Sequence, residues 1–228
     1  SLIIGGSELR RRFVDGVISQ TNHEYLEHLL RYQKSIEQRN HLLKQFYDDR
    51  TFDEAALRLW DEQIASHGAY LLSQRQRFIS EFAPLFKSYY HLIAGDDETP
   101  SIAYVANLVD NADTIIHSSD DQLRQLFLDR LIETRQRDKM LLFTTVGLHR
   151  DDIDMQIDNF AVRKFSSQGQ QKTILLSLKL AQFEYIRNQS GMKPILLLDD
   201  IFDKLDMPRV RQLIHLVGSD RFGQVLLT

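Results

Sequence analysis

Two adjacent carboxylates are the residues of this sequence best placed to do chemistry. Asp199 and Asp200 directly follow the apolar run at residues 195–198, which has the length and composition of a buried β-strand. In α/β folds, ligands bind at the carboxyl ends of the strands. The first carboxylate could hold Mg²⁺ there, and the second could polarise the water that attacks a phosphate. Because other buried strands also end in acidic residues, this pair alone leaves a nucleotide site and an ordinary strand end equally open.

A polar loop that contains a glycine lies upstream of these acids. Residues 166–171 read Ser-Ser-Gln-Gly-Gln-Gln and immediately precede a helix that we expect over about residues 171–188. Gly169 lets an anion approach the backbone closely, and a helix N-terminus offers unpaired N–H groups with a partial positive charge. The loop therefore suits the terminal phosphate of a nucleotide, although a capped helix start is the simpler interpretation of this motif alone.

A third motif, Asp203-Lys204-Leu205-Asp206, comes directly after the two acids. The order of a polar glycine loop, a helix, an apolar strand with Asp-Asp and then Leu-Asp is far more specific than any one motif. It resembles the signature loop, Walker B strand and D-loop of ABC-type ATPase heads. In that class two heads sandwich ATP, and each signature serine faces the nucleotide held by the other head.

The particular residues of these motifs resemble those of the RecF family, which is related to SMC proteins. Residues 167–171 and the Asp-Asp pair carry this resemblance. A third matching segment is Val-Gly-Leu-His-Arg-Asp-Asp at residues 146–152. In this segment Leu148 replaces the family's usual proline, a change that we expect to loosen a turn. Near the start, Gly6 and residues 10–15 are similar to the segment that enters the family's helical arm. The resemblance covers nearly the whole chain and is weakest over about residues 52–120.

The resemblance implies roles for individual residues. Those expected to contact the γ-phosphate held by the partner head belong to the signature loop: Ser167, Gln168, Gly169 and Gln170. Asp199 would serve Mg²⁺, Asp200 would act catalytically on the attacking water, and Asp206 would lie at the dimer interface beside the nucleotide. For residues 149–152, a protein interface and a salt-bridged structural turn both remain open.

The function implied is that of an ATP-dependent DNA-binding recombination mediator. Such a protein acts in DNA replication, recombination and repair and in the SOS response to DNA damage; it binds single-stranded DNA and gapped duplex DNA and helps to load recombinase. The resemblance further implies ATP and Mg²⁺ as cofactors, an ATP-dependent homodimer, RecR as a partner, a cytoplasmic location and weak DNA-dependent ATPase activity. The alternative is a non-enzymatic helical module of another SMC-like protein that binds DNA or protein.

No Gly-x-x-x-x-Gly-Lys-Ser/Thr motif occurs in these 228 residues. Nothing in the sequence therefore cradles the α- and β-phosphates of a nucleotide. We expect residues 1–228 alone neither to bind ATP tightly nor to hydrolyse it.

Composition argues against several other classes. The chain has no cysteine, which excludes disulfides and thiolate chemistry, and no apolar run approaches the roughly 20 residues of a membrane span. With 28 Lys and Arg against 32 Asp and Glu, the net charge of −4 does not itself indicate a nucleic-acid binder. Basic residues cluster locally, however, and the DNA contacts we expect are Arg10, Arg11, Arg12 and Arg39. A solvated helix surface explains these residues equally well.

Hydrophobic periodicity predicts the elements that must position these motifs. The expected helices span about residues 22–47, 53–90 with a kink or break at Pro84, 119–138, 171–188 and 209–217. The expected strands cover residues 140–146, a hairpin at 153–162, residues 194–198 and a last strand from residue 224, inside which we expect the domain to have been cut. The predicted fold class is α/β plus α: the C-terminal half of an ABC/SMC-type P-loop ATPase head with an inserted helical arm domain. We expect the arm at residues 1–138 and the partial head at 139–228.

Overall fold

The computed structural model describes residues 2–109, 112–199, 205–219 and 221–227. The chain forms two compact units: unit 1 comprises Ser1–Thr21, Phe78–Ala103 and Ile153–Thr228, and unit 2 comprises Asn22–Arg77 and Tyr104–Asp152. This division differs from the single boundary expected at residues 138/139, because one long helix and two strands each contribute residues to both units. Each unit therefore combines segments that are distant in sequence.

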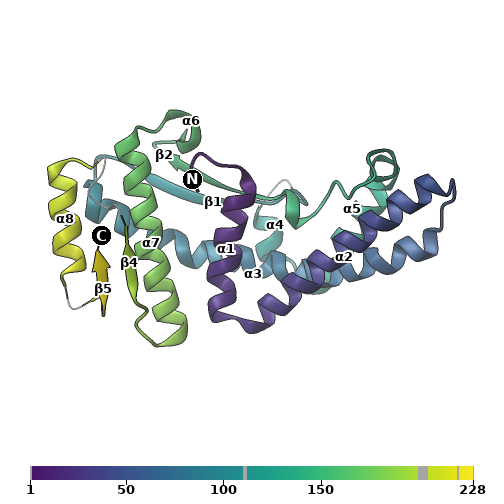
Figure 1. Ribbon diagram of the computed structural model, residues 1–228, viewed down its shortest axis with the longest axis horizontal. Coiled ribbons are helices and arrows are strands. Elements are labelled where there is room, and N and C mark those ends of the chain that lie inside the picture. The colour runs from purple at the N-terminus through teal and green to yellow at the C-terminus, as the bar shows by residue number, and fades with distance from the viewer. Residues whose placement is uncertain (1, 110–111, 200–204, 220, 228) are drawn as a thin grey trace. The chain divides into compact units, whose positions relative to one another are not determined.

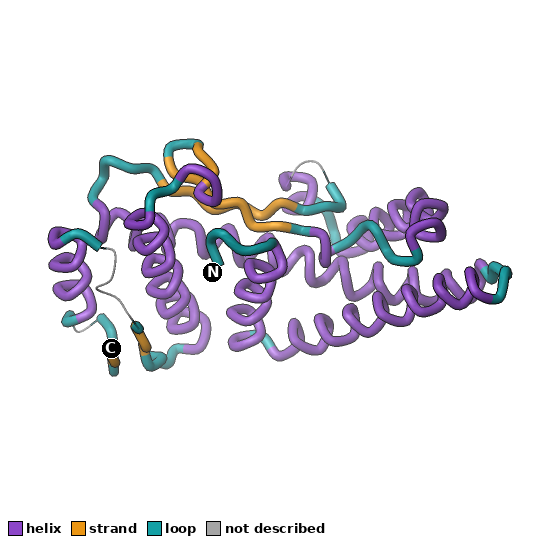
Figure 2. Tube along the Cα trace, turned by 45° about the horizontal axis from the view of Figure 1, so that its top comes forward, coloured by secondary structure: helices purple, strands orange, loops and turns teal. Residues whose placement is uncertain are grey.

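Unit 2 is mainly helical. It contains α2 (His23–Asp48), the first part of α3 (Glu54–Ala94), α4 (Ala112–His117), α5 (Asp120–Leu141) and the 3₁₀ turn η1 (Leu148–Arg150). Helix α2 and the start of α3 run antiparallel and form a helical hairpin (Figure 1, Figure 2). Side chains cap two of these helices: the Asn22 side chain accepts a hydrogen bond from the Tyr25 backbone, and Ser119 forms a capping box with Gln122.

Helices α3 and α5 approach closely at Gly68. A Cβ atom at this position would lie 2.8 Å from the ring of Phe127, so a larger residue would push α5 away. The buried apolar side chains of this unit include Tyr25, Leu43, Leu57, Ile64, Leu71, Phe127 and Leu131. Burial of these side chains from several helices supplies the main stabilisation of the unit.

The prediction of a strand at residues 140–146 is wrong. Helix α5 continues to Leu141 and ends at Leu142, whose φ of 60° is left-handed. The following backbone bonds to side chains instead of to a neighbouring strand: the Thr145 N–H donates to Asp138 Oδ1 at 2.9 Å, and the Thr144 N–H donates to Asn40 Oδ1 at 2.7 Å. An apolar, β-branched composition gave a strand-like pattern that these tertiary contacts override.

Helix α3 is not broken at Pro84, which excludes the break and leaves the kink as the other expected outcome. It runs on to Ala94 with the proline inside it. Pro84 lies on the exposed face of the helix, whereas Phe82 and Phe86 are buried. Because water can reach the backbone at an exposed proline, the lost hydrogen bond is tolerated, and burial of the neighbouring aromatic rings keeps the helix continuous.

Unit 1 combines helices with two small sheets. It contains α1 (Ser7–Thr21), the end of α3, β1 (Pro100–Val105), β2 (Asp152–Ile157), β3 (Phe160–Ala161), α6 (Val162–Phe165), α7 (Gln168–Ser190), β4 (Leu196–Leu198), α8 (Met207–Val217) and β5 (Val225–Leu227). Strands β1-β2-β3 form one sheet in that order, and β4 pairs with β5 in parallel. The parallel pair and the β2–β3 hairpin were both predicted, and Asp158 and Asn159 form its turn with positive φ.

Aromatic rings form much of the core of unit 1. Phe78 lies 4.8 Å from Phe82 and 4.9 Å from Tyr185, measured between ring centroids, and Phe183 lies 4.9 Å from Phe222. Such edge and tilted packing joins the end of α3 to α7 and to the segment before β5. Helix α1 packs against α7 as well.

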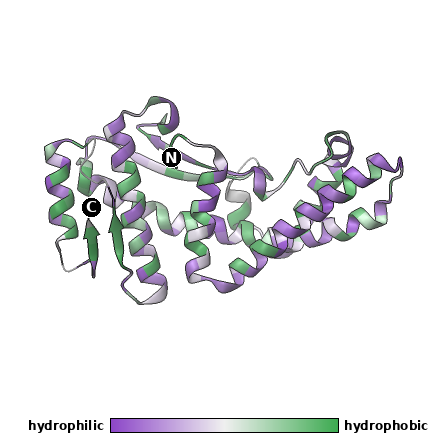
Figure 3. Cartoon of the chain, viewed as in Figure 1, coloured by the Kyte–Doolittle hydropathy of each residue, from purple (hydrophilic) through white to green (hydrophobic). Residues whose placement is uncertain are grey.

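The strand predicted to be buried on both faces is covered on one face only. Leu196 and Leu198 are buried, whereas Ile195 is 59% and Leu197 is 65% exposed. Leu226 on β5 is also exposed, and Figure 3 shows both strands as strongly hydrophobic. Within the described residues, the second face of this two-stranded sheet is an apolar surface open to solvent.

Candidate functional site

The signature loop ends in a capping box at the start of α7. Ser167 is the N-cap, and its hydroxyl accepts a hydrogen bond from the Gln170 N–H at 3.2 Å. In return, Gln170 Oε1 accepts from the Ser167 N–H at 2.8 Å. Both Ser167 and Gln168 are exposed. The first helical N–H groups, which have no intrahelical acceptor, therefore lie at an accessible surface with the positive end of the helix dipole.

The other end of the Gln170 side chain is held inside unit 1. Its Nε2 atom donates to Glu98 Oε1 at 2.9 Å. One turn later, the Thr173 hydroxyl donates to the Gly169 carbonyl at 3.0 Å, and Thr173 is fully buried. The first turn of α7 is thus fixed by side chains on its inner face, while its N-terminal end remains open.

Glu98 was not among the predicted site residues. It lies in the loop between α3 and β1, and its Oε2 atom accepts a hydrogen bond from the hydroxyl of buried Tyr90. Burial raises the pKa of Tyr90, and its hydrogen bond with the Glu98 carboxylate acts in the same direction. Tyr90 therefore remains a hydroxyl donor at neutral pH. In the sequence this loop showed only turn residues, so no local signal marked Glu98.

Asp206, the last residue of the D-loop motif, is the N-cap of α8. Its Oδ1 atom accepts from the Arg209 N–H at 2.9 Å. The Arg209 side chain extends back to α7, where Nη1 donates to Thr173 Oγ1 at 3.3 Å, and its Nη2 lies 3.8 Å from Glu98 Oε1. Arg209 was also missed, because a single arginine in a helix carries no motif.

The predicted Walker B carboxylates follow β4. Asp199 is described and exposed, whereas Asp200 lies outside the described residues, as do Asp203 and Lys204. Within unit 1, α7 runs antiparallel to β4, so the N-terminal end of α7 and the carboxyl end of β4 lie on the same side (Figure 1). The ligand-binding arrangement expected of an α/β fold requires this relationship.

The residues present are compatible with Mg²⁺ and a nucleotide. Among the described residues, no group of three or more His, Asp or Glu side chains could enclose a metal ion. Mg²⁺ does not need such a cage, since it commonly binds one or two carboxylates together with water and substrate phosphates. An exposed carboxylate at Asp199 fits this mode.

Arg39 is not a DNA contact, contrary to prediction. Its side chain is fully buried; Nε donates to Asp61 Oδ1 at 2.7 Å, and Nη1 donates to Asp138 Oδ2 at 2.7 Å. The helical period explains the error, because Arg39 lies on the same face of α2 as buried Ile36 and Leu43. Its charge is compensated inside unit 2.

The three consecutive arginines of α1 differ in exposure. Arg10 is buried and its Nη1 donates to the Gly5 carbonyl at 2.7 Å, so its assignment as a surface DNA contact is wrong. Arg11 is half-buried. Arg12 is exposed and lies 2.6 Å from the carboxylate of Glu8. Only Arg12 retains the full exposure that a phosphate contact requires.

Residues 147–152 form a structural turn. Asp151 is 1% exposed, and its carboxylate accepts from the Asn107 N–H at 2.7 Å and from the Tyr104 hydroxyl. The guanidinium of Arg75 lies 3.7 Å away. Burial raises the pKa of Tyr104, and the negative charge of Asp151 adds to this effect. For Asp151 the geometry favours the salt-bridged turn over a protein interface.

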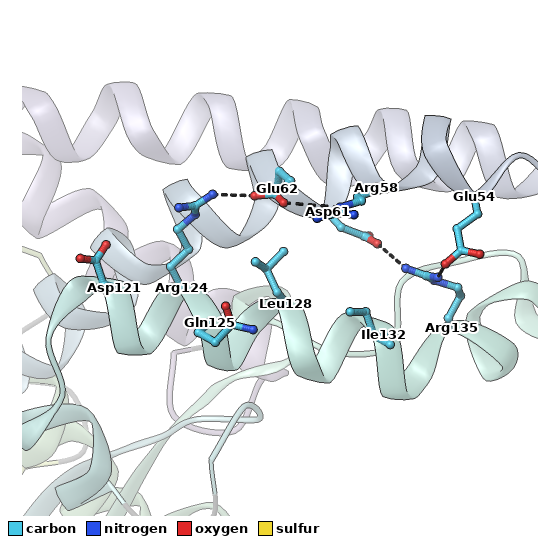
Figure 4. A pocket seen from close by; sticks show the side chains of 10 residues that line it. All are labelled: Glu54, Arg58, Asp61, Glu62, Asp121, Arg124, Gln125, Leu128, Ile132 and Arg135. Carbon is cyan, nitrogen blue, oxygen red and sulfur yellow. Dashed lines mark hydrogen bonds and ion pairs between the residues drawn. The ribbon is translucent and has the colours of Figure 1, made fainter.

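Unit 2 also contains a cleft of about 540 Å³ between α3 and α5. Figure 4 shows that its arginines point toward carboxylates. Arg124 lies 2.6 Å from Glu62, and Arg135 pairs with Glu54 and lies 3.3 Å from Asp61. Because these charges are compensated within the cleft, it is not a basic groove for nucleic acid.

Comparison with known proteins identifies the class to which this fold and site belong. No family model matches the sequence. One solved structure is described as the recombination mediator protein RecF-ATP in the RecFOR pathway. Its match extends over 100% of this chain and 58% of the RecF chain, with 29% sequence identity and a TM-score of 0.86. A second, described as RecF-ATPrS, gives the same TM-score. The chain therefore has the fold of the part of the RecF structure that it covers, with one mainly helical unit and one unit of helices and small sheets.

The sequence relatives of the chain are RecF proteins. The DNA replication and repair protein RecF of Flavobacterium johnsoniae is 42% identical over 100% of this chain, and that of Phocaeicola vulgatus is 43% identical. Over its whole length the chain is therefore similar to RecF proteins. It spans 59% and 57% of the lengths of these two relatives. None of the described helices has the length and apolarity needed to cross a membrane.

Proposed function

We propose that the full-length protein is an ATP-dependent, DNA-binding recombination mediator of DNA replication and repair, and that this chain supplies its signature loop, Walker B strand and D-loop. The similarity to RecF proteins over the whole chain supports this assignment. The observation that carries it is the open, capped N-terminus of α7 on the same side of unit 1 as the carboxyl end of β4 (Figure 1).

Each predicted residue of the signature loop and of the Asp-Asp pair has a role in this proposal. The Ser167 hydroxyl and the first N–H groups of α7, at Gln168 and Gly169, bind the γ-phosphate of ATP held by a partner head. Gln170 fixes their orientation through its capping bond to Ser167. When bound, Mg²⁺ neutralises phosphate charge beside Asp199. Asp200 orients the attacking water.

The nucleotide sandwich requires parts that these 228 residues do not contain. The loop that cradles the α- and β-phosphates belongs, in this proposal, to the remainder of the full-length protein. The same remainder covers the apolar face formed by Ile195, Leu197 and Leu226, since exposed apolar surfaces of this kind mark packing interfaces. Asp206 then lies at the interface between two heads.

ATP binding closes a homodimer that grips duplex DNA at single-strand gaps, and slow hydrolysis releases it. RecR is the proposed partner in loading recombinase, and the proposed setting is the cytoplasm during the SOS response to DNA damage. Exposed basic residues offer phosphate contacts: Arg12 on α1, and Arg31, Lys34 and Lys44 on α2. Because contacts of Arg and Lys with phosphates release counterions from DNA, binding through these residues should weaken as salt rises.

Sedimentation velocity of the full-length protein, with and without ATP and Mg²⁺, tests the proposal. We expect ATP to convert monomer to dimer and to strengthen binding to gapped duplex DNA. Asp200→Asn should preserve the ATP-dependent dimer and slow its dissociation, because hydrolysis is impaired. If ATP alters neither assembly nor DNA affinity and Asp200→Asn has no effect, a non-enzymatic helical interaction module is the correct alternative.

A further inference from the structure

Two side chains outside the three sequence motifs connect the signature loop to the D-loop. They are Glu98, which precedes β1, and Arg209, in the first turn of α8. The N-terminal ends of α7 and α8 lie on the same side of unit 1 (Figure 1). These two side chains bridge the first turns of the helices.

Three side chains contact the carboxylate of Glu98. Oε1 accepts from Gln170 Nε2 at 2.9 Å and lies 3.8 Å from Arg209 Nη2, while Oε2 accepts from the Tyr90 hydroxyl. Only 22% of its side-chain surface is exposed. A half-buried carboxylate with both oxygens engaged holds its partners in defined positions, and charge-assisted hydrogen bonds are stronger than neutral ones.

Arg209 contacts Asp206 directly and reaches the signature loop through Thr173. Nη1 donates to Thr173 Oγ1 at 3.3 Å, and the Thr173 hydroxyl in turn donates to the Gly169 carbonyl. Nε lies 3.8 Å from Asp206 Oδ2, and the Arg209 N–H donates to Asp206 Oδ1. The side chain is 18% exposed. Its planar fork is suited to holding several acceptors at fixed angles, which a lysine cannot do.

The contacts form two routes into the first turn of α7. One leads from Arg209 through Glu98 and the Gln170 amide to the backbone of Ser167; the other leads through Thr173 to the carbonyl of Gly169. Both act on the inner face of the turn and leave the Ser167 hydroxyl and the first N–H groups at the open end. Displacement of Arg209 would therefore alter the direction of these donors without removing them.

We infer that Glu98 and Arg209 are positioning residues that fix the first turn of α7 against the Asp206 cap of α8, so that the signature loop and Asp206 meet the partner head as one rigid surface. The inference rests on the proposed function, because it assigns a further role at the same site. Neither residue touches the nucleotide in this arrangement. A ligand that needs both loops in register loses affinity when that register is relaxed, although each loop remains present.

The test uses full-length protein and the variants Arg209→Ala, Arg209→Lys and Glu98→Gln, with Arg211→Ala as the matched control. Arg211 lies on the same helix and is exposed. Sedimentation velocity with ATP and Mg²⁺ gives the dimer dissociation constant. We expect Arg209→Ala and Glu98→Gln each to raise it at least tenfold, Arg209→Lys to give an intermediate value, and Arg211→Ala to leave it unchanged. The double variant Glu98→Gln/Arg209→Ala should have a dimer dissociation constant no higher than that of the more impaired single variant, because both residues act through one network.

A second measurement separates this inference from the proposed function. Hydrogen exchange at residues 168–173 of nucleotide-free protein should accelerate in Arg209→Ala and not in Arg211→Ala. If wild-type protein fails to dimerise with ATP while this acceleration occurs, the proposed function fails and the positioning network stands. Unchanged exchange in Arg209→Ala, or effects on dimerisation that multiply in the double variant, overturns the positioning role.

Discussion

Nη1 of Arg39 lies 2.7 Å from Oδ2 of Asp138, and neither side chain is exposed to solvent. Asp61, also buried, pairs with Nε of the same arginine. One cation from α2 therefore joins two carboxylates, from α3 and α5, in the interior of unit 2. A residue that the sequence suggested as a DNA contact instead connects the three helices.

Replacing Arg39 with methionine should destabilise the protein strongly. The change keeps much of the side-chain volume and leaves two buried carboxylates without their shared cation, which costs about 3–5 kcal/mol when one partner of a buried pair is removed. Urea unfolding measures the loss. Lys34→Met, at an exposed position of the same helix, is the control and should change stability little. A loss for Arg39→Met no larger than for Lys34→Met would contradict the buried network.

Gly147→Ala should also be destabilising, for a steric reason. Gly147 has a φ of 123°, and a Cβ there would lie 2.5 Å from the Tyr32 hydroxyl. That hydroxyl accepts a hydrogen bond from the Leu148 N–H at 2.9 Å, so it cannot move without leaving a buried donor unpaired. We expect a loss of about 2–4 kcal/mol, the sum of backbone strain and a displaced hydrogen bond.

Gly191→Ala is the control for this substitution. Gly191 also has a positive φ, of 71°, but nothing lies within 4 Å of a Cβ built there. Its replacement should cost about 1 kcal/mol, from backbone conformation alone. Chemical denaturation of both variants compares the two positions. Equal losses would show that the Tyr32 contact does not determine the cost at Gly147.

Local signals in the sequence predicted most helices and the order of the motifs. Asn22, Ser119 and Gly191 mark helix ends through their own side chain or backbone freedom, so their positions follow from short-range chemistry. The strand expected at residues 140–146 failed because its backbone bonds to Asp138 and Asn40. Asn40 is about a hundred residues away in sequence, and no local pattern contains such a contact.

The candidate site was predictable where it consists of a contiguous motif and not where it depends on tertiary contacts. Ser167 and Gln170 form a capping box whose spacing is visible in the sequence. Glu98 and Arg209 reach the same turn from a loop and from another helix, so only the fold brings them together. Arg39 is the opposite case, a residue that was assigned to the site and is structural. Nothing in the sequence around this basic residue indicates that buried carboxylates from other helices lie opposite it.

Acidification should destabilise unit 2 through His67. Burial lowers the pKa of His67 from its ordinary 6.5, and the positive charges of His28 and Arg31 lower it further. The unfolded chain therefore takes up a proton at a higher pH than the folded chain. The contribution of neutral His67 to stability is complete above pH 6.5 and is lost as pH falls through 6.5 toward the lower folded pKa.

Denaturation midpoints measured between pH 7.5 and about pH 5 check this prediction. His67→Gln should flatten the decline, whereas His41→Gln, at an exposed position of α2, should not. His28 Nδ1 lies 3.3 Å from His67 Nδ1, so His28→Gln should flatten it partly. A decline unaffected by His67→Gln would refute the assignment.

Substitutions at Ser167 can separate its capping role from its proposed phosphate contact. Aspartate caps a helix as well as serine does, and its negative charge is favourable at a helix N-terminus. Ser167→Asp should therefore leave thermal stability close to wild type, but its carboxylate would repel the γ-phosphate of the partner head's ATP. We expect the ATP-dependent dimer of the full-length protein to be lost. Ser167→Ala should instead cost about 1 kcal/mol of stability and weaken the dimer only partly, since the backbone N–H donors remain.

The start of α5 provides a matched control. Ser119 and Gln122 form the same reciprocal cap, with the Gln122 N–H 3.3 Å from Ser119 Oγ and the Ser119 N–H 2.8 Å from Gln122 Oε1. Ser119→Asp should preserve both stability and the ATP-dependent dimer, because no phosphate is proposed to bind there. If Ser167→Asp dimerises with ATP as Ser119→Asp does, then Ser167 acts only as a helix cap and the signature-loop assignment is wrong. Sedimentation velocity and thermal unfolding of the two variants, measured in parallel, decide between these roles.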